Sequence, residues 1–342
     1  MKGEHKMKKI ICKIIFLLLL CICLFTHEVK GMQNTENEDT KQIIEEQSET
    51  LGINELIQQA ENYTQDVFEE LDFTELLNSA IAGEIDNKKL GNTLLSLLGD
   101  EFFNTIKTIG LIMIIIVIHS ILKNITEGLE NKSVSKIVYY VQYILIVTIM
   151  MSNFVDIITM VKDSIQNLVG FSNALIPVLM TLVLTTGSIA SANMMQPILL
   201  FIITFIGNVI VQLIIPIILG ATVLGIVSKV SDRVQLDGLS KFFKTSVVWL
   251  IGIMLTVFVG LLSVEGSLSS SVDGITAKTA KAAVSSFIPV VGKILGDAVD
   301  TVIGCASILK NAVGIVGVIV IIGICVLPIL KLALLMFAYY LR

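Results

Sequence analysis

Long apolar runs recur along this chain, and they limit its fold more than any other feature. They occupy residues 102–122, 137–161, 168–186, 197–227, 247–262 and 313–330. A membrane-spanning α-helix needs about 20 predominantly apolar residues, because backbone groups inside lipid must bond to one another. The chain is only 15% charged, against about 25% in an average soluble domain. The sequence therefore predicts an all-α, polytopic helical membrane protein.

The first 31 residues have the pattern of an export signal. Lys8 and Lys9 precede an apolar run at 10–25, which Lys13 alone interrupts, and a short polar stretch ends at Gly31. A basic start followed by an apolar centre is typical of a secretory signal peptide. An uncleaved signal anchor is the alternative. Both place the following segment on the outer side of the membrane.

Residues 32–100 form an acidic region, with sixteen Asp and Glu against three Lys. Its polar start, through Thr50, is predicted to be disordered. Apolar residues then recur at helical spacing and predict two or three amphipathic helices, separated near Asp72 and Gly83. Two interpretations stay open: a small helical core with a solvated acidic face, or a partner-docking region outside the membrane. The excess of acid argues against binding to nucleic acid.

The membrane region, residues 101–264, contains about five apolar segments and two clusters of basic residues. The clusters are expected in cytoplasmic loops by the positive-inside rule. Their members are Lys123, Lys132 and Lys136 in the first cluster and Lys229, Arg233, Lys241 and Lys244 in the second.

An even number of crossings must separate two cytoplasmic loops, yet three apolar segments lie between them, at 137–161, 168–186 and 197–227. One of the three is therefore expected not to cross. The segment 168–186 is one candidate, as a re-entrant hairpin, which is tolerated only where protein or water covers it. The segment 197–227 is the other, since Pro216 and Gly220 offer a break.

Residues 265–312 are small, amphipathic and dotted with charge, unlike the apolar runs around them. Glycines four apart on one side of a helix let a second helix approach closely in lipid. Lys293 lies four residues before Asp297, so the two can pair. The segment is predicted to pack between spans, to line a polar cavity or to lie at the interface. Its helix-packing or pore-lining candidates are Asp273, Lys278, Lys281, Pro289, Gly292, Lys293, Gly296, Asp297, Asp300 and Gly304. Residues 313–342 follow as a C-terminal membrane segment.

The sequence gives no support for catalysis. It contains no nucleotide-binding P-loop, no H-E-x-x-H and no G-x-S-x-G. The five cysteines form no C-x-x-C pair, so neither zinc nor a disulfide framework is indicated. We therefore predict no enzyme activity, no cofactor and no metal. Intramembrane acids and bases are too few for an obvious proton relay, and no inverted halves indicate a secondary transporter.

The segment 261–328 resembles the stage III sporulation protein AE family of endospore-forming bacteria. The resemblance rests on Ser267-Leu-Ser-Ser-Ser-Val-Asp273-Gly-Ile, Ala277-Lys278-Thr-Ala-Lys281, Phe287-Ile-Pro289-Val-Val-Gly292 and Gly296-Asp297-Ala-Val-Asp300. It implies a multi-pass protein of the mother-cell membrane facing the forespore, within a channel-like, secretion-related complex. The implied partners are the other membrane proteins of the same operon and the forespore protein Q. Family members usually continue beyond this point, so the resemblance also implies a truncated chain at Arg342.

Three functions are compatible with these features. The first is a permease-like or export-gate-like membrane component of the sporulation channel, in which the charged residues of 265–312 face a subunit interface or a hydrated path. The second is a non-conducting scaffold, in which the same residues make interhelical hydrogen bonds. The third and least favoured is a stand-alone small-molecule carrier. Contact with membrane lipid is common to all three, and self-association into a homo-oligomer is left open.

Overall fold

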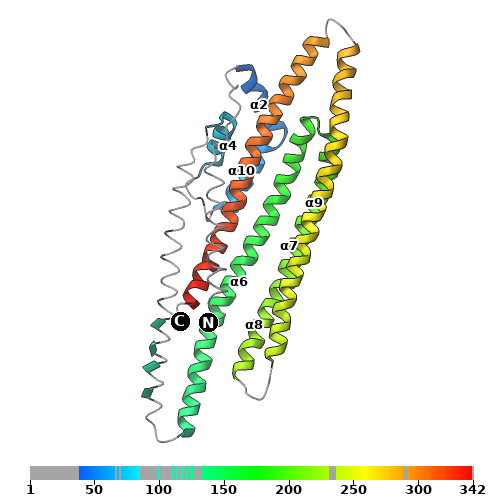
Figure 1. Cartoon of the computed structure of the whole chain (residues 1–342). Helices are drawn as coiled ribbons and strands as arrows, with labels where there is room; N and C mark the ends of the chain where they lie inside the picture. Colours follow the sequence, from blue (N-terminus) through cyan, green and yellow to red (C-terminus); the bar gives the residue numbers. More distant parts are fainter. Residues whose placement is uncertain are drawn as a thin grey trace. The chain divides into compact units, whose positions relative to one another are not determined.

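The computed structural model describes residues 38–65, 68, 71–84, 99, 103, 110, 113–114, 117–118, 120–121, 124–125, 132–230, 236–287 and 292–340. Every regular element in these ranges is a helix (Figure 1). The helices are α2 (Glu38–Thr50), α3 (Ile53–Thr64), α4 (Phe73–Ala82), α6 (Lys132–Thr185), α7 (Ile189–Val209), the π-helical η1 (Ile210–Ile214), α8 (Ile215–Val230), α9 (Asp237–Phe287) and α10 (Gly292–Tyr340). The signal-like segment 1–31 and most of the apolar run 102–122 lie outside the described residues.

Four stretches of the described helices are long and apolar enough to cross a membrane: Met151–Thr185, Ile189–Ser228, Asp237–Ser263 and Ala298–Ala333. These stretches confirm the predicted fold class, an all-α protein with several membrane-capable helices. The last of them carries the highest mean hydropathy, 3.1.

The chain divides into two compact units. Among the described helices, one unit holds α6 through Ser164 and α10 from Cys325 onward. The other holds α2, α3 and α4, the rest of α6 and α10, and the helices α7, η1, α8 and α9. The second unit contains the buried core described below.

Residues 38–50 form helix α2, so the expectation of disorder through Thr50 is wrong for this part. The stretch is strongly polar, but it carries Ile43 and Ile44 on consecutive positions. Ile44 is only 7% exposed, and α2 contacts α3. A single buried apolar anchor against a neighbouring helix thus orders a segment whose composition alone is typical of disorder.

Helix α4 begins and ends where the sequence predicts. The Asp72 carboxylate accepts hydrogen bonds from the backbone N–H groups of Thr74 and Glu75, at 2.8 and 3.1 Å. Such a cap stabilises a helix by about 1 kcal/mol. At the other end, Gly83 has φ 73°, and the next N–H bonds back to the Ser79 carbonyl at 2.9 Å. This left-handed ending favours glycine because a side chain is strained there.

Helix α6 runs unbroken for 54 residues, through both apolar segments 137–161 and 168–186. The re-entrant hairpin expected at 168–186 is therefore wrong. The polar residues between the segments, such as Lys162 and Gln166, are good helix formers, and they include no Gly or Pro. Pro177 lies inside the helix without ending it. The helix ends at a tight turn, where Gly187 has φ 91°.

The continuity of α6 resolves the conflict between the apolar segments and the basic clusters. Three apolar segments lie between the clusters, but only two helical rods do: α6, and the continuous rod α7–η1–α8. One crossing by each rod would place both basic clusters on one side of the membrane and the turn at Gly187 on the other, as the positive-inside rule requires. At 1.5 Å per residue the 54 residues of α6 span about 81 Å, so a single crossing leaves part of this rod outside a hydrocarbon layer about 30 Å thick.

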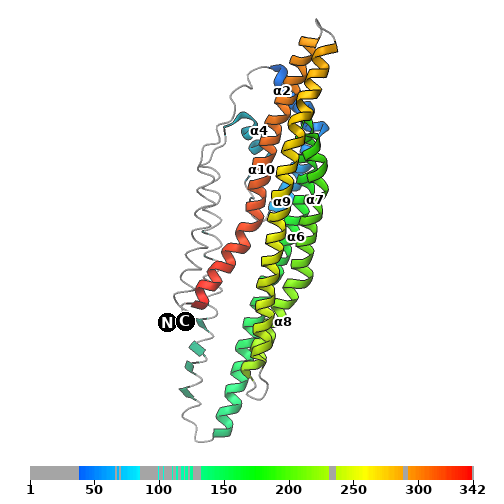
Figure 2. The same ribbon diagram turned by 45° about the vertical axis from the view of Figure 1, so that its right-hand side comes forward.

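The rod α7–η1–α8 contains the second proline that could have broken an apolar segment. Pro216 has no N–H, and its ring would crowd the carbonyl of Gln212 in a regular α-helix. The chain widens into the π-helical turn η1 just before it, where the Ile215 N–H bonds to the Ile210 carbonyl. The rod then continues to Val230 alongside α9 (Figures 1 and 2). Pro216 thus produces a local adjustment and no break.

The core of the larger unit is centred on one face of α10. Its buried residues recur at spacings of three and four and are mostly small or β-branched: Cys305, Ala306, Leu309, Ala312, Val313, Val316, Gly317, Ile319, Val320, Gly323 and Ile324. A side chain at Gly317 would collide with Leu175 of α6, 2.7 Å away. One at Gly323 would collide with the ring of Phe68. These glycines let α6 and the segment between α3 and α4 approach α10 closely.

Two further glycines of the unit mark close helix contacts. A side chain at Gly170 of α6 would collide with Tyr63 of α3, whose ring meets Phe171 edge-on at 6.3 Å. A side chain at Gly207 of α7 would collide with Val169 of α6. The acidic helices are therefore packed against the apolar helices of this unit.

We predict that Gly323→Leu destabilises the larger unit by about 1–3 kcal/mol, the usual penalty for overpacking. Phe68 cannot move aside easily, because it is 6% exposed and packs edge-on against Phe73 at 6.1 Å. Thermal unfolding of the purified protein in detergent measures the loss, and limited proteolysis of residues 38–84 reports undocking. Gly304→Leu is the matched control on the same helix, since nothing lies within 4 Å of its added side chain. Equal behaviour of the two variants would contradict the close contact.

Reporter fusions test the topology. With two crossings between the basic clusters, fusions after Thr186 and Ser270 should report the outer side, and a fusion after Gln235 the cytoplasm. Alkaline phosphatase and green fluorescent protein give opposite signals at each site, and so control for expression. A Thr186 fusion on the same side as the Gln235 fusion would show that α7–η1–α8 does not cross.

Candidate functional site

A stretch of small and charged residues covers the end of α9 and the start of α10. The apolar run 247–262 of α9 is followed by small and charged residues from Glu265 onward, but the helix continues to Phe287. Helix α10 starts at Gly292, and its first turns carry Lys293, Asp297 and Asp300. The end of α9 and the start of α10 lie at the same end of the unit (Figures 1 and 2). We call residues 264–287 and 292–301 the polar extension.

Helix length shows why the polar extension must leave the hydrocarbon layer. At 1.5 Å per residue, the 51 residues of α9 span about 77 Å, whereas the layer is about 30 Å thick. The 49 residues of α10 span about 74 Å. Since the most apolar parts of the two helices are best accommodated in the layer, the small and charged residues of the extension are the part expected to project.

The first turn of α10 whose side chains are described is more exposed than the turns that follow. Residues 298–302 are all exposed, whereas Cys305, Ala306 and Leu309 are buried. A helix that packs on one side buries one position in three or four. Exposure of five consecutive positions means that the packed core begins only after this turn. The described side chains of the extension, at 298–301, therefore lie outside the packed core.

The predicted site residues fall in or next to this extension. Asp273, Lys278 and Lys281 belong to the last part of α9, and Gly292, Lys293, Gly296 and Asp297 belong to the first turns of α10; their backbone is helical, and their side chains lie outside the described residues. Pro289 is also outside the described residues. Asp300 and Gly304 are described and exposed. Among the described residues, no atom lies within 4 Å of a Cβ added at Gly304, and the helix packing expected there stays a prediction.

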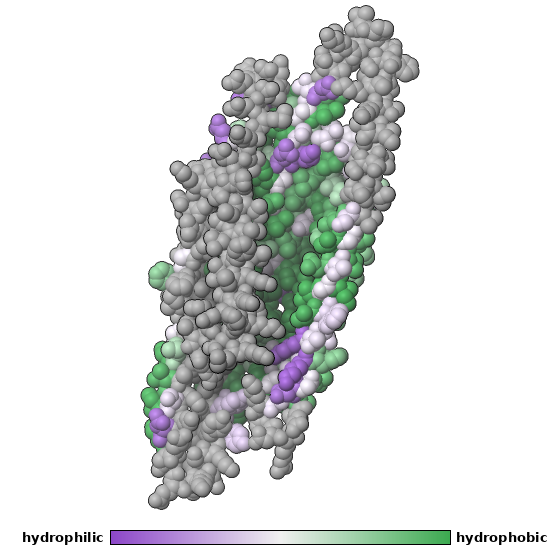
Figure 3. Space-filling view, viewed as in Figure 1, coloured by the Kyte–Doolittle hydropathy of each residue, from purple (hydrophilic) through white to green (hydrophobic). Residues whose placement is uncertain are grey.

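The apolar window of α9 is the least covered of the four membrane-capable stretches. Only 6% of it is buried, against 44% of the window in α10. Val248 and Trp249 are 70% and 69% exposed. The face shown in Figure 3 is mainly apolar along the middle of the described helices. In a membrane, such a surface contacts lipid or another apolar helix.

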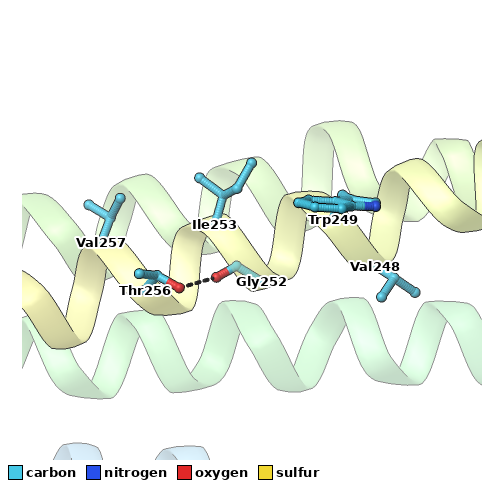
Figure 4. A pocket seen from close by; sticks show the side chains of 6 residues that line it. All are labelled: Val248, Trp249, Gly252, Ile253, Thr256 and Val257. Atoms are coloured by element: carbon cyan, nitrogen blue, oxygen red, sulfur yellow. Dashed lines mark hydrogen bonds between the residues drawn. The ribbon is translucent and has the colours of Figure 1, made fainter.

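A shallow apolar hollow lies on this face of α9 (Figure 4). It is lined by Val248, Trp249, Gly252, Ile253, Thr256 and Val257. The Thr256 hydroxyl donates to the Gly252 carbonyl at 2.8 Å, so its polarity is satisfied within the helix. The hollow therefore presents almost no hydrogen-bonding group to a ligand, and its shape suits an acyl chain or an apolar side chain.

The interior of the described helices contains few polar side chains. Their buried polar side chains are Thr64, Ser172 and Ser240. Thr64 donates to the Ala60 carbonyl at 2.6 Å, and Ser240 donates to the Ala221 carbonyl at 2.8 Å. Two of the three hydroxyls thus bond to backbone, and no row of buried polar groups lines a route through the described part of the unit. Among the described residues, no group of three or more His, Cys, Asp or Glu side chains lies close enough to bind a metal.

Sequence reasoning missed the glycines that do make close contacts: Gly170, Gly207, Gly317 and Gly323. Gly170 contacts Tyr63 and Gly317 contacts Leu175, and each partner is more than 100 positions away in the chain. Gly207 contacts Val169, which is nearly 40 positions away. No local spacing identifies such a pair. A signal did exist for Gly317 and Gly323, because both interrupt the most hydrophobic of the apolar runs.

Comparisons with known proteins agree on one family. The family model of stage III sporulation protein AE matches residues 71–342. The chain is 32% identical to the stage III sporulation protein AE of Bacillus subtilis strain 168 over 246 residues. The aligned residues make up 72% of this chain and 62% of that relative. The match thus spans less than two thirds of the relative's length. No solved structure matches the chain.

We predict that Trp249→Ala changes the stability of the purified protein by no more than about 0.5 kcal/mol, because the side chain contacts little of its own chain. Leu309→Ala, at a fully buried position of α10, should cost about 2–5 kcal/mol. Thermal unfolding in the same detergent compares the two variants. A large loss from Trp249→Ala would show that this face of α9 is covered within the protein.

Proposed function

Because the chain belongs to the stage III sporulation protein AE family, we propose that it is a membrane component of the sporulation channel or secretion-like complex that links mother cell and forespore. In this proposal the protein resides in the mother-cell membrane facing the forespore. Its partners are the other membrane proteins of the same operon and the forespore protein Q. It performs no catalysis and needs no cofactor.

The polar extension is the observation that carries the proposal. A protein that only crossed a bilayer would need helices of about 20 residues, whereas α9 and α10 exceed twice that length. Their excess length is small and charged, and the described turn at 298–302 is exposed all round. A helical projection of this kind is suited to contact a partner outside the hydrocarbon layer.

The acidic helices add a second surface at the outer side. The amide of Gln47 in α2 donates to the Val302 carbonyl of α10, at 3.4 Å. This weak contact places α2 next to the first described turns of α10. The polar faces of α2, α3 and α4 remain exposed, with Glu45, Glu46 and Glu55 among them. Partners would therefore meet basic and acidic groups from two parts of the chain in the same neighbourhood.

The scarcity of buried polar side chains supports a role within an assembly. A stand-alone carrier needs a binding site near the bilayer midplane, formed by polar groups or by interrupted helices. The buried polar side chains of the described helices bond mainly to backbone and converge on no such site. A path for solute would therefore form between this protein and its partners. The same observation favours a non-conducting scaffold as the second candidate function.

Charge reversal in the extension tests the proposal. Lys278→Glu combined with Lys281→Glu should lower the yield of heat-resistant spores by about tenfold or more, since like charges across an interface cost several kcal/mol. Co-purification of the operon's other membrane proteins with the tagged variant should fall in parallel. Lys241→Glu, at an exposed position near the start of α9, is the control for a change of charge. Both variants must reach the membrane at wild-type levels.

Normal sporulation and normal co-purification with both lysines reversed would argue that the extension is not a docking surface. Conduction separates the channel from the scaffold. Vesicles that contain the protein together with its operon partners should leak a small fluorescent solute if the assembly is a channel. Intact assembly without any leak would favour the scaffold.

A further inference from the structure

The rod α7–η1–α8 has one exposed face that interrupts its apolar character. The residues on this face follow one another at helical spacing: Phe201, Phe205, Asn208, Gln212 and Pro216. The two phenylalanine rings stack at 5.8 Å, with 14° between their planes. The amides of Asn208 and Gln212 come next, one helical turn apart. We call these five residues the amide face.

The amide face lies at membrane depth. Phe201 is 68% exposed and Phe205 52%, on one side of the two amides along the rod. Leu213 and Val223 are 46% and 45% exposed on the other side. Both groups need lipid or an apolar neighbour around them, because large apolar side chains exposed to water are unfavourable. The hydrocarbon layer that covers both groups also covers Asn208 and Gln212.

The two amides make no hydrogen bond with any other described side chain or backbone group that would account for them. The opposite side of the rod is occupied, since Gly207 packs against Val169 of α6. Both amides are exposed on the side away from that contact. A carboxamide in lipid keeps two donors and an acceptor that lipid cannot satisfy, so it favours association with another polar helix surface.

The backbone next to the amides is also unusual. A π-helical turn is rare, and such turns occur frequently at functional sites. Pro216 cannot donate the hydrogen bond that an α-helix would give to the Gln212 carbonyl. The Gln212 carbonyl therefore lacks its usual α-helical donor. The two side-chain amides supply both donors and acceptors on this surface, without any charged group.

We infer that the amide face is a self-association surface, on which a second copy of this chain packs within the membrane. A carboxamide is self-complementary, because it carries both an N–H donor and a carbonyl acceptor, so two copies can bond to each other. In a two-fold symmetric contact, a residue near the axis meets its own copy, so Asn208 faces Asn208 and Gln212 faces Gln212. An uncharged surface with both donors and acceptors suits an identical copy better than an acidic or basic partner. The inference goes beyond the proposed function, since it holds whether or not the complex conducts.

Cysteine cross-linking in membranes of the full chain, expressed without its partner proteins, tests this contact. The five native cysteines are replaced by serine, and single cysteines are introduced as Asn208→Cys, Gln212→Cys and Val257→Cys. Oxidation should produce a covalent dimer through positions 208 and 212. Val257 is 54% exposed on α9 and serves as the control for random collision. Its cross-linked fraction should be at least about fivefold lower.

A second experiment removes the hydrogen-bonding groups at positions 208 and 212 and introduces no cysteine there. Energy transfer between two fluorescent fusions of the chain measures its self-association. The apparent association constant should fall about fivefold when Asn208→Leu and Gln212→Leu are combined, because leucine is compatible with lipid but forms no side-chain hydrogen bond. Asn193→Leu is the matched control, an exposed amide of the same rod nearer to its end. It should associate like the unchanged protein.

Four outcomes would overturn the inference. The first is a cross-link at 208 and 212 no stronger than at 257. The second is labelling of both cysteines by a membrane-impermeant thiol reagent, which would mean that the amides face water. The third is unchanged energy transfer in the double leucine variant. Cross-linking only after the operon's partner proteins are added would assign the face to one of them and would also overturn the self-association.

Discussion

Inside lipid, a peptide group has no water to bond to, and this constraint determines how the helices of the protein are built. Every backbone N–H and C=O in the hydrocarbon layer has to find its partner along the chain. A helix that broke at Pro177 or at Pro216 would leave several such groups unbonded. The chain instead continues α6 through Pro177 and widens into a π-helical turn before Pro216. Continuity of the rods is therefore a condition for each of them to cross the layer.

Close packing of these rods depends on small residues, because the hydrophobic effect does not drive apolar helices together in lipid. Dispersion contacts require the backbones to approach, and the structure provides four glycines where they do. Two of them lie on α10, whose buried face is the centre of the larger unit. The acidic helices use the same device, since Phe68 and Tyr63 each pack onto a glycine of an apolar helix. Their docking is therefore a matter of shape, and their charges stay on the exposed side.

Much of the architecture could be predicted from the sequence, and the parts that could not share a cause. Local signals predicted the membrane-capable helices, and the cap at Asp72 and the left-handed turn at Gly83 gave the bounds of α4. The order of α2 was missed, because it depends on Ile44 meeting another helix. The continuity of α6 was missed because hydropathy reports two apolar segments and says nothing of the helix that joins them. The packing glycines were missed because their partners are distant in the chain. The predicted polar residues stay a prediction, since most of their side chains are outside the described residues.

The two uncovered surfaces of the larger unit differ in a way that bears on assembly. The face of α9 around the hollow is mainly apolar, and the Thr256 hydroxyl in the hollow bonds to its own helix. Lipid can cover such a surface without any penalty, so its exposure alone indicates no partner. The amide face differs, because lipid leaves the donors and acceptors of Asn208 and Gln212 unsatisfied. Exposure of polar groups at membrane depth is the stronger indication of a protein neighbour. A protein with few buried polar side chains, one lipid-compatible face, one hydrogen-bonding face and a projecting polar extension is organised to function among other chains and not alone.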